Sequence, residues 1–219
     1  MNKGKSRLAA SVLFILLGVR HVYAISATQE SYLDKMAGTL SVISQPFISE
    51  GTVTGCTFVF NVLTRDHIYR QGKFIKVTGS IGLMKAQNSL GVTVKVVVNE
   101  MAVDQSGQVV LKPSAPDRAY LIGSGYKNNL SGLVNSGQSD TAGGVFSVYQ
   151  LEPSLPILME QLQTQAASIG FNRAGGQSDI QINIDLTVEN FTNAGERLHN
   201  QKAIQEFSEC MIVLLEADK

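Results

Sequence analysis

Tryptophan is absent from this 219-residue chain, and histidine and cysteine are scarce, with three and two residues. The lack of tryptophan disfavours a site that stacks carbohydrate. His21 lies in an N-terminal export signal described below, so two histidines remain, too few for a three-histidine metal site. No Gly-x-Ser-x-Gly motif or comparable catalytic pattern is present. We therefore predict no catalytic residue, no metal site and no cofactor.

Long hydrophobic runs are lacking as well. An uncharged, mostly apolar stretch over residues 8–19 is followed by Arg20, whereas a membrane span needs about 20 apolar residues. Basic residues and no acidic residue precede this stretch, and Val22 and Ala24 supply the small side chains that a signal peptidase reads. This layout predicts a cleaved signal peptide over residues 1–24. We expect a bacterial protein that is periplasmic or secreted, with no membrane span after cleavage.

The whole chain also lacks a net charge, because 18 basic residues balance 18 acidic ones. The predicted signal peptide holds four of the basic residues and none of the acidic ones, which leaves 14 against 18 and a net charge of −4. Nucleic acids and anionic lipids are bound by clustered Lys and Arg, and the sequence contains no basic run. The sequence therefore argues against nucleic acid as the main partner.

The two cysteines, Cys56 and Cys210, both lie outside the predicted signal peptide. An even number of cysteines in an exported chain indicates a disulfide bond. Cys56 shares one face of a predicted strand with Phe58 and Phe60, and Cys210 lies on the apolar stripe of a predicted helix with Phe207. We therefore predict a bond that ties the last helix to an early strand. The alternative is two buried free thiols.

Strand patterns dominate the first half of the chain. Residues 53–63, 74–83 and 91–103 are rich in β-branched and aromatic side chains, and apolar and polar residues alternate along them. A capping pattern predicts a short helix over residues 28–37 ahead of these strands. The short connections between the strands favour an antiparallel sheet.

The second half adds helices. Apolar residues at helical spacing predict a helix over residues 154–169, which Gly170 would end, and a second helix over residues 200–217. Residues 179–188 alternate strictly and predict a strand covered on one face. We therefore predict a single α+β domain over residues 25–219, with a mostly antiparallel sheet of six to eight strands packed by two C-terminal amphipathic helices. A β-sandwich with helical additions is the alternative.

A change in composition marks residues 123–144, which are rich in Gly, Ser and Asn and have weak periodicity. We predict a long exposed loop there. Such a loop in a compact domain is either functional or a tolerated surface insertion. If it is functional, Tyr126, Lys127, Asn128 and Asn129 are the candidates for contact with a partner.

Two further positions carry weaker signals. Arg173 lies in a glycine-containing turn and is a candidate ligand contact. Asp66 and His67 follow a predicted strand, and residues of these types perform acid–base chemistry in enzymes. A solvated turn is the better interpretation of this pair, because adjacent residues at a strand end point in different directions.

The leading hypothesis for function is a non-enzymatic, exported protein that binds another envelope or secreted protein. It rests on the disulfide-stabilised scaffold, the lack of a catalytic motif and the long polar loop. Two alternatives stay open. One is a carrier that holds a small ligand between the sheet and the helices. The other is a small hydrolase whose residues assemble only in three dimensions, with Asp66 and His67 at its centre.

Overall fold

The structure, a computed structural model, describes residues 25–86, 89–104, 106–192 and 194–216. The predicted signal peptide lies outside these residues. In the described part of the chain the main sheet has seven antiparallel strands, in the order β1-β2-β3-β4-β8-β7, with β5 paired to the far half of β4. Its strands are β1 (Gly38–Ser49), β2 (Thr52–Asp66), β3 (Lys73–Ala86), β4 (Ser89–Val103), β5 (Val109–Pro113), β7 (Leu133–Gln138) and β8 (Gly144–Gln150).

Strands β2, β3 and β4 form the centre of the main sheet because their side chains alternate between two faces. On the inner face, Phe58 of β2 pairs with Ile81 of β3, which pairs with Val94 of β4, and all three are buried. Aromatic and β-branched residues pack well on a pleated surface. A shift of one residue would turn this apolar row to the outer face, so the burial of the inner face fixes the register.

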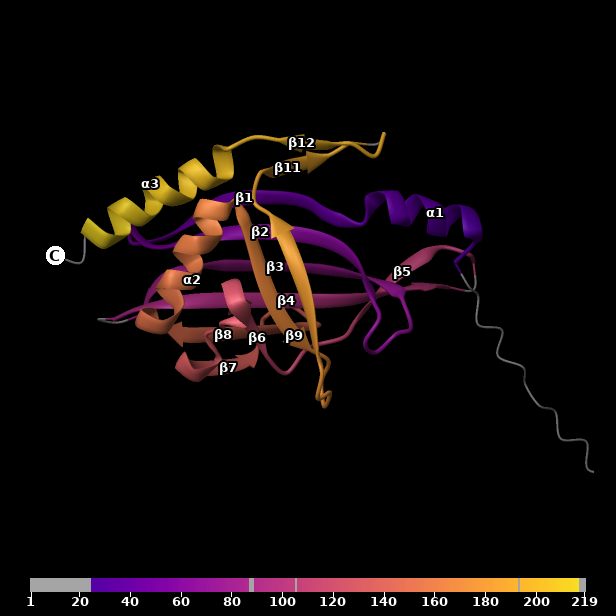
Figure 1. Ribbon diagram of the computed structural model, residues 1–219, viewed down its shortest axis with the longest axis horizontal. Helices are drawn as coiled ribbons and strands as arrows, with labels where there is room; N and C mark the ends of the chain where they lie inside the picture. Colours follow the sequence, from indigo (N-terminus) through magenta and orange to yellow (C-terminus); the bar gives the residue numbers. More distant parts are fainter. Residues whose placement is uncertain (1–24, 87–88, 105, 193, 217–219) are drawn as a thin grey trace, which may run out of the picture.

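A second layer covers the inner face of the main sheet (Figure 1). It consists of a smaller antiparallel sheet, in the order β10-β9-β6, together with the helices α2 and α3. Leu121, Ile169 and Ile182 of the smaller sheet belong to the same apolar core as the inner face of the main sheet. The predicted α+β class is confirmed. The elements of this layer are β6 (Ala119–Ile122), α2 (Leu151–Thr164), β9 (Ala166–Asn172), β10 (Asp179–Asp185) and α3 (Lys202–Glu216).

Helix α1 (Ala27–Met36) lies where the sequence predicted a short helix. The Ser26 hydroxyl accepts a hydrogen bond from the Gln29 backbone N–H, and the Gln29 side chain accepts one from the Ser26 backbone N–H. This capping box satisfies N–H groups that have no partner inside the helix. Leu33 of the helix packs with Leu63, whose side chain lies on the outer face of β2.

The predicted disulfide bond between Cys56 and Cys210 is confirmed. It joins β2 to α3 across a sequence separation of 154 residues. Close to it, the rings of Phe58 and Phe207 stack with their centroids 4.1 Å apart. The last helix is therefore held to the sheet by a covalent bond and by packing. A disulfide is compatible with an oxidising, exported compartment.

The helix predicted over residues 154–169 is shorter in the structure, because α2 ends at Thr164. Gln165 adopts a left-handed backbone (φ 58°), which ends the helix without a glycine, and the chain continues directly as β9. Gly170 lies inside β9 and does not end a helix. A Cβ atom at Gly170 would lie 2.4 Å from Cζ of the Tyr120 ring, so close packing explains the glycine.

Residues 123–144 were predicted as one long exposed loop, and the structure corrects this expectation. They contain the short 3-10 helices η1 (Ser124–Tyr126) and η2 (Leu130–Gly132), followed by β7. Glycine and asparagine are depleted in strands, but β8 offers unpaired backbone groups, and β7 pairs with them. The exposed part is therefore divided between the η1 region and an edge strand of the main sheet.

Candidate functional site

The edge segment, residues 123–138, connects β6 to the border of the main sheet and contains the four predicted partner contacts. Tyr126, Lys127 and Asn128 are exposed, whereas Asn129 is fully buried. The Tyr126 side chain has an exposed fraction of 83%. The structure therefore leaves the first three residues accessible to a partner and gives Asn129 a place in the interior.

The backbone around Tyr126 has an unusual conformation. Gly125 and Tyr126 have φ angles of 62° and 60°, in the left-handed region. Glycine adopts this region at no cost, but for a bulky residue such as Tyr126 it is a genuine outlier. A short turn fixes it, because the Gly123 N–H donates to the Lys127 carbonyl at 2.7 Å and the Lys127 N–H donates to the Ser124 carbonyl at 3.3 Å.

Asn129 anchors the edge segment to the rest of the fold. Its side-chain oxygen accepts a hydrogen bond from the Leu121 N–H at 2.9 Å, and its amide nitrogen donates to the Ser154 hydroxyl at 3.0 Å. The first bond fixes the segment to β6 and the second fixes it to α2. A buried amide without such partners would be destabilising, so these bonds explain why an asparagine stands at this position.

The edge segment follows α2 before it enters the sheet. The Ser124 N–H donates to Glu160 of α2 at 2.9 Å, and a Cβ atom at Gly132 would lie 2.6 Å from Pro153, near the start of the helix. Glu160 and Pro153 are seven residues apart, which is about 10 Å along a helix axis. The segment is therefore braced by α2 over about two turns and presents Tyr126 from a rigid support.

The edge segment also exposes apolar side chains where β7 begins. Leu133 and Val134 have exposed fractions of 45% and 62%. The register of β7 against β8 shifts between Leu133 and Asn135, so Val134 occupies a β-bulge. Adjacent exposed apolar residues are more typical of interaction surfaces than single ones, which are ordinary. The edge segment therefore combines the predicted contact residues with an apolar strand end.

Arg173, the predicted ligand contact, belongs to a charged cluster where β2, β4 and β9 end. Its Nη2 atom lies 2.7 Å from a carboxylate oxygen of Glu100, and Arg70 pairs with the other oxygen. Burial, and next the charge of Arg173, lowers the pKa of Arg70, while Asp66 acts in the opposite direction. A cavity large enough for about one water molecule lies among these groups. Arg173 is thus engaged with Glu100, while its side chain stays 43% exposed.

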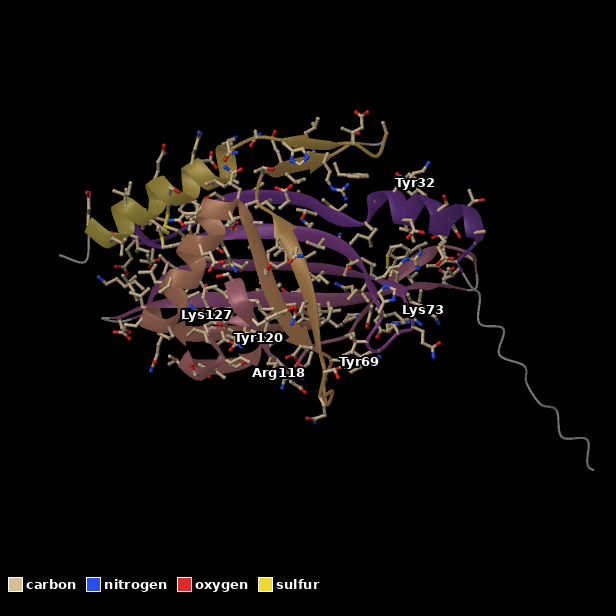
Figure 2. All side chains as sticks on the ribbon, viewed as in Figure 1. Tyr32, Tyr69, Lys73, Arg118, Tyr120 and Lys127 are labelled. Carbon is tan, nitrogen blue, oxygen red and sulfur yellow. A yellow bond between two sulfur atoms is a disulfide. The ribbon has the colours of Figure 1, made fainter. Side chains whose placement is uncertain are left out.

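A second polar cluster ties β6 to β10 (Figure 2). Arg118 donates two hydrogen bonds to one oxygen of Asp179, at 3.0 and 2.7 Å, and the Tyr120 hydroxyl donates to the other oxygen at 2.8 Å. Tyr69 lies nearby and donates to the Ser178 carbonyl. Burial, followed by the hydrogen bond to Asp179, raises the pKa of Tyr120 to about 12. Tyr120 therefore stays protonated at neutral pH and cannot act there as a base.

Asp66 and His67, the centre of the hydrolase alternative, have different environments. Asp66 is 3% exposed, and its Oδ1 atom accepts hydrogen bonds from the backbone N–H groups of Ile68 and Tyr69 at 2.9 and 2.8 Å. His67 is exposed to solvent. In the part of the chain that the structure describes, no hydrogen bond joins the two side chains. The carboxylate stabilises the turn that follows β2.

The sequence did not suggest a third group, which lies at the hairpin of β11 (Val188–Phe191) and β12 (Arg197–His199). The Thr187 hydroxyl lies 2.7 Å from Asp185 Oδ1 and 2.8 Å from His199 Nδ1. In a nucleophilic triad the histidine lies between the hydroxyl and the carboxylate. Here Asp185 bonds to the hydroxyl, and its other oxygen lies 3.7 Å from the same Nδ1 atom of His199 that faces Thr187. The carboxylate therefore does not orient the histidine from its far side as in a triad, and the three groups support the hairpin. A local turn joins Asp185 to Thr187, and strand pairing brings His199 to them, so the sequence gave no signal of the whole group.

These observations define the chain as a disulfide-linked α+β protein with a braced, partly apolar edge segment. Among the described residues, no group of three or more His, Cys, Asp or Glu side chains is placed to hold a metal ion. No described helix is both long and apolar enough to cross a membrane. No protein-family model, curated protein or solved structure matches the chain. The functional argument therefore rests on the residues of the site.

Proposed function

We propose that the chain is an exported, non-enzymatic protein-binding module whose partner, another envelope or secreted protein, contacts the edge segment. The observation that carries this proposal is Tyr126, whose side chain is 83% exposed on a left-handed backbone with a φ angle of 60°. Backbone strain of this kind clusters at functional sites, where the surrounding structure maintains it. Tyrosine is also enriched among the residues that dominate binding energy at protein interfaces.

The rigidity of the edge segment supports the same proposal. Asn129 fixes the segment to β6 and α2, and Glu160 holds the backbone of Ser124. A surface that is already ordered before binding loses less conformational entropy when a partner docks. The segment therefore has the preorganisation that a specific interface requires, whereas a tolerated insertion needs no such anchors.

A photo-crosslinking experiment in the native host tests the proposal. The photoreactive amino acid p-benzoylphenylalanine replaces Tyr126 in the full-length chain, and intact cells are irradiated. The matched control carries the same substitution at Tyr32, which is 50% exposed on α1. Figure 2 shows Tyr32 on α1 at the right and Lys127 left of centre below α2, so the two probes lie well apart.

The expected result is one crosslinked product, which contains the chain and its partner in a 1:1 ratio. It forms from position 126 and is absent from position 32. The crosslinked partner should also bind the unmodified, oxidised protein, and Tyr126→Ala should weaken that binding by about 30-fold or more, since truncating a hot-spot residue costs about 2 kcal/mol or more. A folded protein that gives no product from position 126, or the same products from both positions, would contradict the proposal.

A further inference from the structure

The strand β7 differs from the other border strands of the main sheet in containing neither a charged residue nor proline, although it is short and has a β-bulge at Val134. At the opposite border, β1 packs against α3 and β11 and contains Pro46. The short strand β5 contains Lys112 and Pro113. Covering elements, charged residues and proline are the features that protect sheet edges. The six residues of β7 include neither a charged residue nor proline, and Figure 1 shows the strand at the border of the sheet.

The hydrogen bonds to β8 establish which backbone groups of β7 are free. Just beyond the strand, the Ser139 N–H donates to the Gly144 carbonyl at 2.9 Å, so these two residues form a bonded pair. Bonded and non-bonded pairs alternate along antiparallel strands. Gly137 with Phe146, two positions along the register, is therefore also a bonded pair.

The residues between these positions turn their backbone groups outward. Ser136 pairs with Ser147 as a non-bonded pair, in which side chains approach closely, and their hydroxyl oxygens are 2.9 Å apart. The N–H and C=O groups of Ser136 and Gln138 therefore face away from β8. Among the described strands, β8 is the one that pairs with β7, and no turn or loop backbone hydrogen bond of the described chain reaches these groups. Because Val134 forms a bulge, the regular free edge extends over residues 135–138.

Gly137 adds a second, independent feature to this edge. It lies opposite Phe146 on the outer face of the sheet, and a Cβ atom at Gly137 would have no atom within 4 Å. Phe146 is only partly buried. Glycine in a strand marks a place where another chain can approach closely, and a large side chain on the next strand can pack across it. The open space therefore gives an added strand access to the Phe146 ring.

We propose that the partner of this chain adds an extended segment to β7 as a further antiparallel strand of the main sheet. The segment bonds to the outward backbone groups of Ser136 and Gln138, and it places an aromatic or β-branched residue opposite Gly137, against Phe146. This mode is strand addition, in which main-chain bonds supply affinity and alternate side chains supply specificity. The inference rests on the proposed function and specifies that the partner binds through an extended segment.

A second copy of this chain fits the edge less well than a different protein does. If two β7 strands paired with each other, residues 135–138 of one would face the same residues of the other. These are Asn, Ser, Gly and Gln, so they offer no aromatic or β-branched side chain to cover Phe146. The chemistry of the edge therefore favours a segment with a different sequence.

Selection from a library of random peptides tests the inference and does not require the partner itself. Random twelve-residue peptides are displayed on phage. They are selected against the protein that is expressed from the full-length chain, exported by the host and purified in oxidised form. The most enriched peptide is synthesised and added to the isotope-labelled protein, and amide hydrogen exchange is followed residue by residue by NMR. Exchange at Ser136 and Gln138 should slow about tenfold or more, and the peptide should carry an aromatic or β-branched residue in its central part.

Substitution at Gln138 separates backbone pairing from side-chain contact. Gln138→Pro removes the outward N–H, and proline is tolerated at an edge where the N–H faces solvent. Gln138→Ala keeps the N–H and removes the side chain. The affinity for the selected peptide should fall about tenfold in the proline variant, because a hydrogen bond is lost and its acceptor is left unpaired. It should change less than twofold in the alanine variant.

Several outcomes would overturn the inference. These are protection of amides elsewhere on the protein, equal losses in the two Gln138 variants, or self-association of the unmodified chain with the same amides protected. If the proline variant does not fold, protection of Ser136 and Gln138 in the unmodified protein decides the matter. If crosslinking at Tyr126 captures a partner whose binding is unaffected by Gln138→Pro, the proposed function stands and strand addition fails.

Discussion

Tyr126 and Asn129 show how residues three positions apart acquire opposite roles. Both lie in a polar, glycine-rich part of the sequence, yet Tyr126 is 83% exposed and Asn129 is fully buried. The difference comes from α2, whose Ser154 meets Asn129 and whose Glu160 holds the neighbouring backbone. Asn129 holds the edge segment in place, and the segment in turn keeps the Tyr126 side chain exposed on the surface.

The strain at Tyr126 leads to the first prediction. A left-handed backbone costs a bulky residue about 1–2 kcal/mol, whereas the added freedom of glycine in the unfolded chain costs about 0.4–1 kcal/mol. Tyr126→Gly should therefore raise the free energy of unfolding by about 0–1.6 kcal/mol while it weakens partner binding. Urea denaturation measures the change. Lys127→Gly is the matched control, because Lys127 has an ordinary φ of −58° and should gain nothing. A stability loss in Tyr126→Gly would contradict the argument.

Tyr149 leads to a prediction about alkaline pH. The side chain is 1% exposed, its hydroxyl donates to the Ala119 carbonyl at 2.5 Å, and burial raises its pKa to about 12. In the unfolded chain the pKa is about 10. Below pH 10 both states keep the proton, and the contribution to stability is complete. Between pH 10 and 12 the unfolded state releases the proton first, so the free energy of unfolding falls by up to about 1.4 kcal/mol per pH unit.

The variant Tyr149→Phe checks this behaviour. It should lose about 1 kcal/mol at neutral pH, because the Ala119 carbonyl loses a hydrogen bond. Between pH 10 and 12 its stability should decline less steeply than that of the unmodified chain, since one shifted group is gone. Urea denaturation at a series of pH values measures both slopes. Parallel slopes would show that Tyr149 does not contribute to the alkaline decline.

At the scale of elements, the sequence predicts the helices, strands and bonds whose hydrophobic spacing fits only one kind of structure. Cys56 and Cys210 each lie in phase with apolar neighbours, so their side chains had to face the core, and the bond is confirmed. The boundary between α2 and β9 could not be predicted. Ile169 fits the helical spacing that begins at Leu155 and equally fits the alternation in β9, and short apolar runs do not separate these cases. A left-handed Gln165 ends the helix where no glycine marks the end.

The disulfide supports a prediction at the same scale. Closing a loop of this length restricts the unfolded chain, for which the chain-entropy model gives about 5 kcal/mol at most. The double variant Cys56→Ala with Cys210→Ala should lose about 2–5 kcal/mol of unfolding free energy. Amide exchange in α3 should accelerate more than in β3, because α3 then depends on packing such as the Phe207 stack. Equal acceleration in both elements would show that the bond stabilises the fold as a whole and not the helix attachment.

At the scale of the whole molecule, the candidate site is part of the main sheet, because the edge segment contains β7. The sequence predicted that this region is exposed, and Tyr126, Lys127 and Asn128 are exposed in the structure. It could not show that the same region completes the main sheet, because strand formation at β7 depends on β8 and not on the propensity of residues 133–138. The edge strand β7 and the residues that lead into it are held by hydrogen bonds to β6, β8 and α2, so this surface has less conformational freedom than an unanchored loop.

Deleting residues 125–143 therefore should not leave the fold intact. The deletion removes β7 from the sheet and Asn129 from its bonds with Leu121 and Ser154. The lost hydrogen bonds and the Leu121 N–H left without a partner cost about 3 kcal/mol or more, a large share of the stability of about 5–15 kcal/mol typical of a domain. Thermal unfolding followed by circular dichroism should show a melting temperature lower by several degrees or no cooperative transition.

The double substitution Tyr126→Ala with Leu133→Ala is the matched control for this deletion. Tyr126 is 83% exposed and Leu133 is 45% exposed, so the melting temperature should change far less than in the deletion, because substitutions at exposed positions alter stability by about 0.5 kcal/mol or less each. Partner binding, in contrast, should be lost in both variants. If the deleted chain unfolds at the same temperature as the intact protein, the segment is a dispensable insertion, and the anchoring of Tyr126 by the fold does not hold. If only the deleted chain loses stability while both lose binding, the segment serves the sheet and the interface at once.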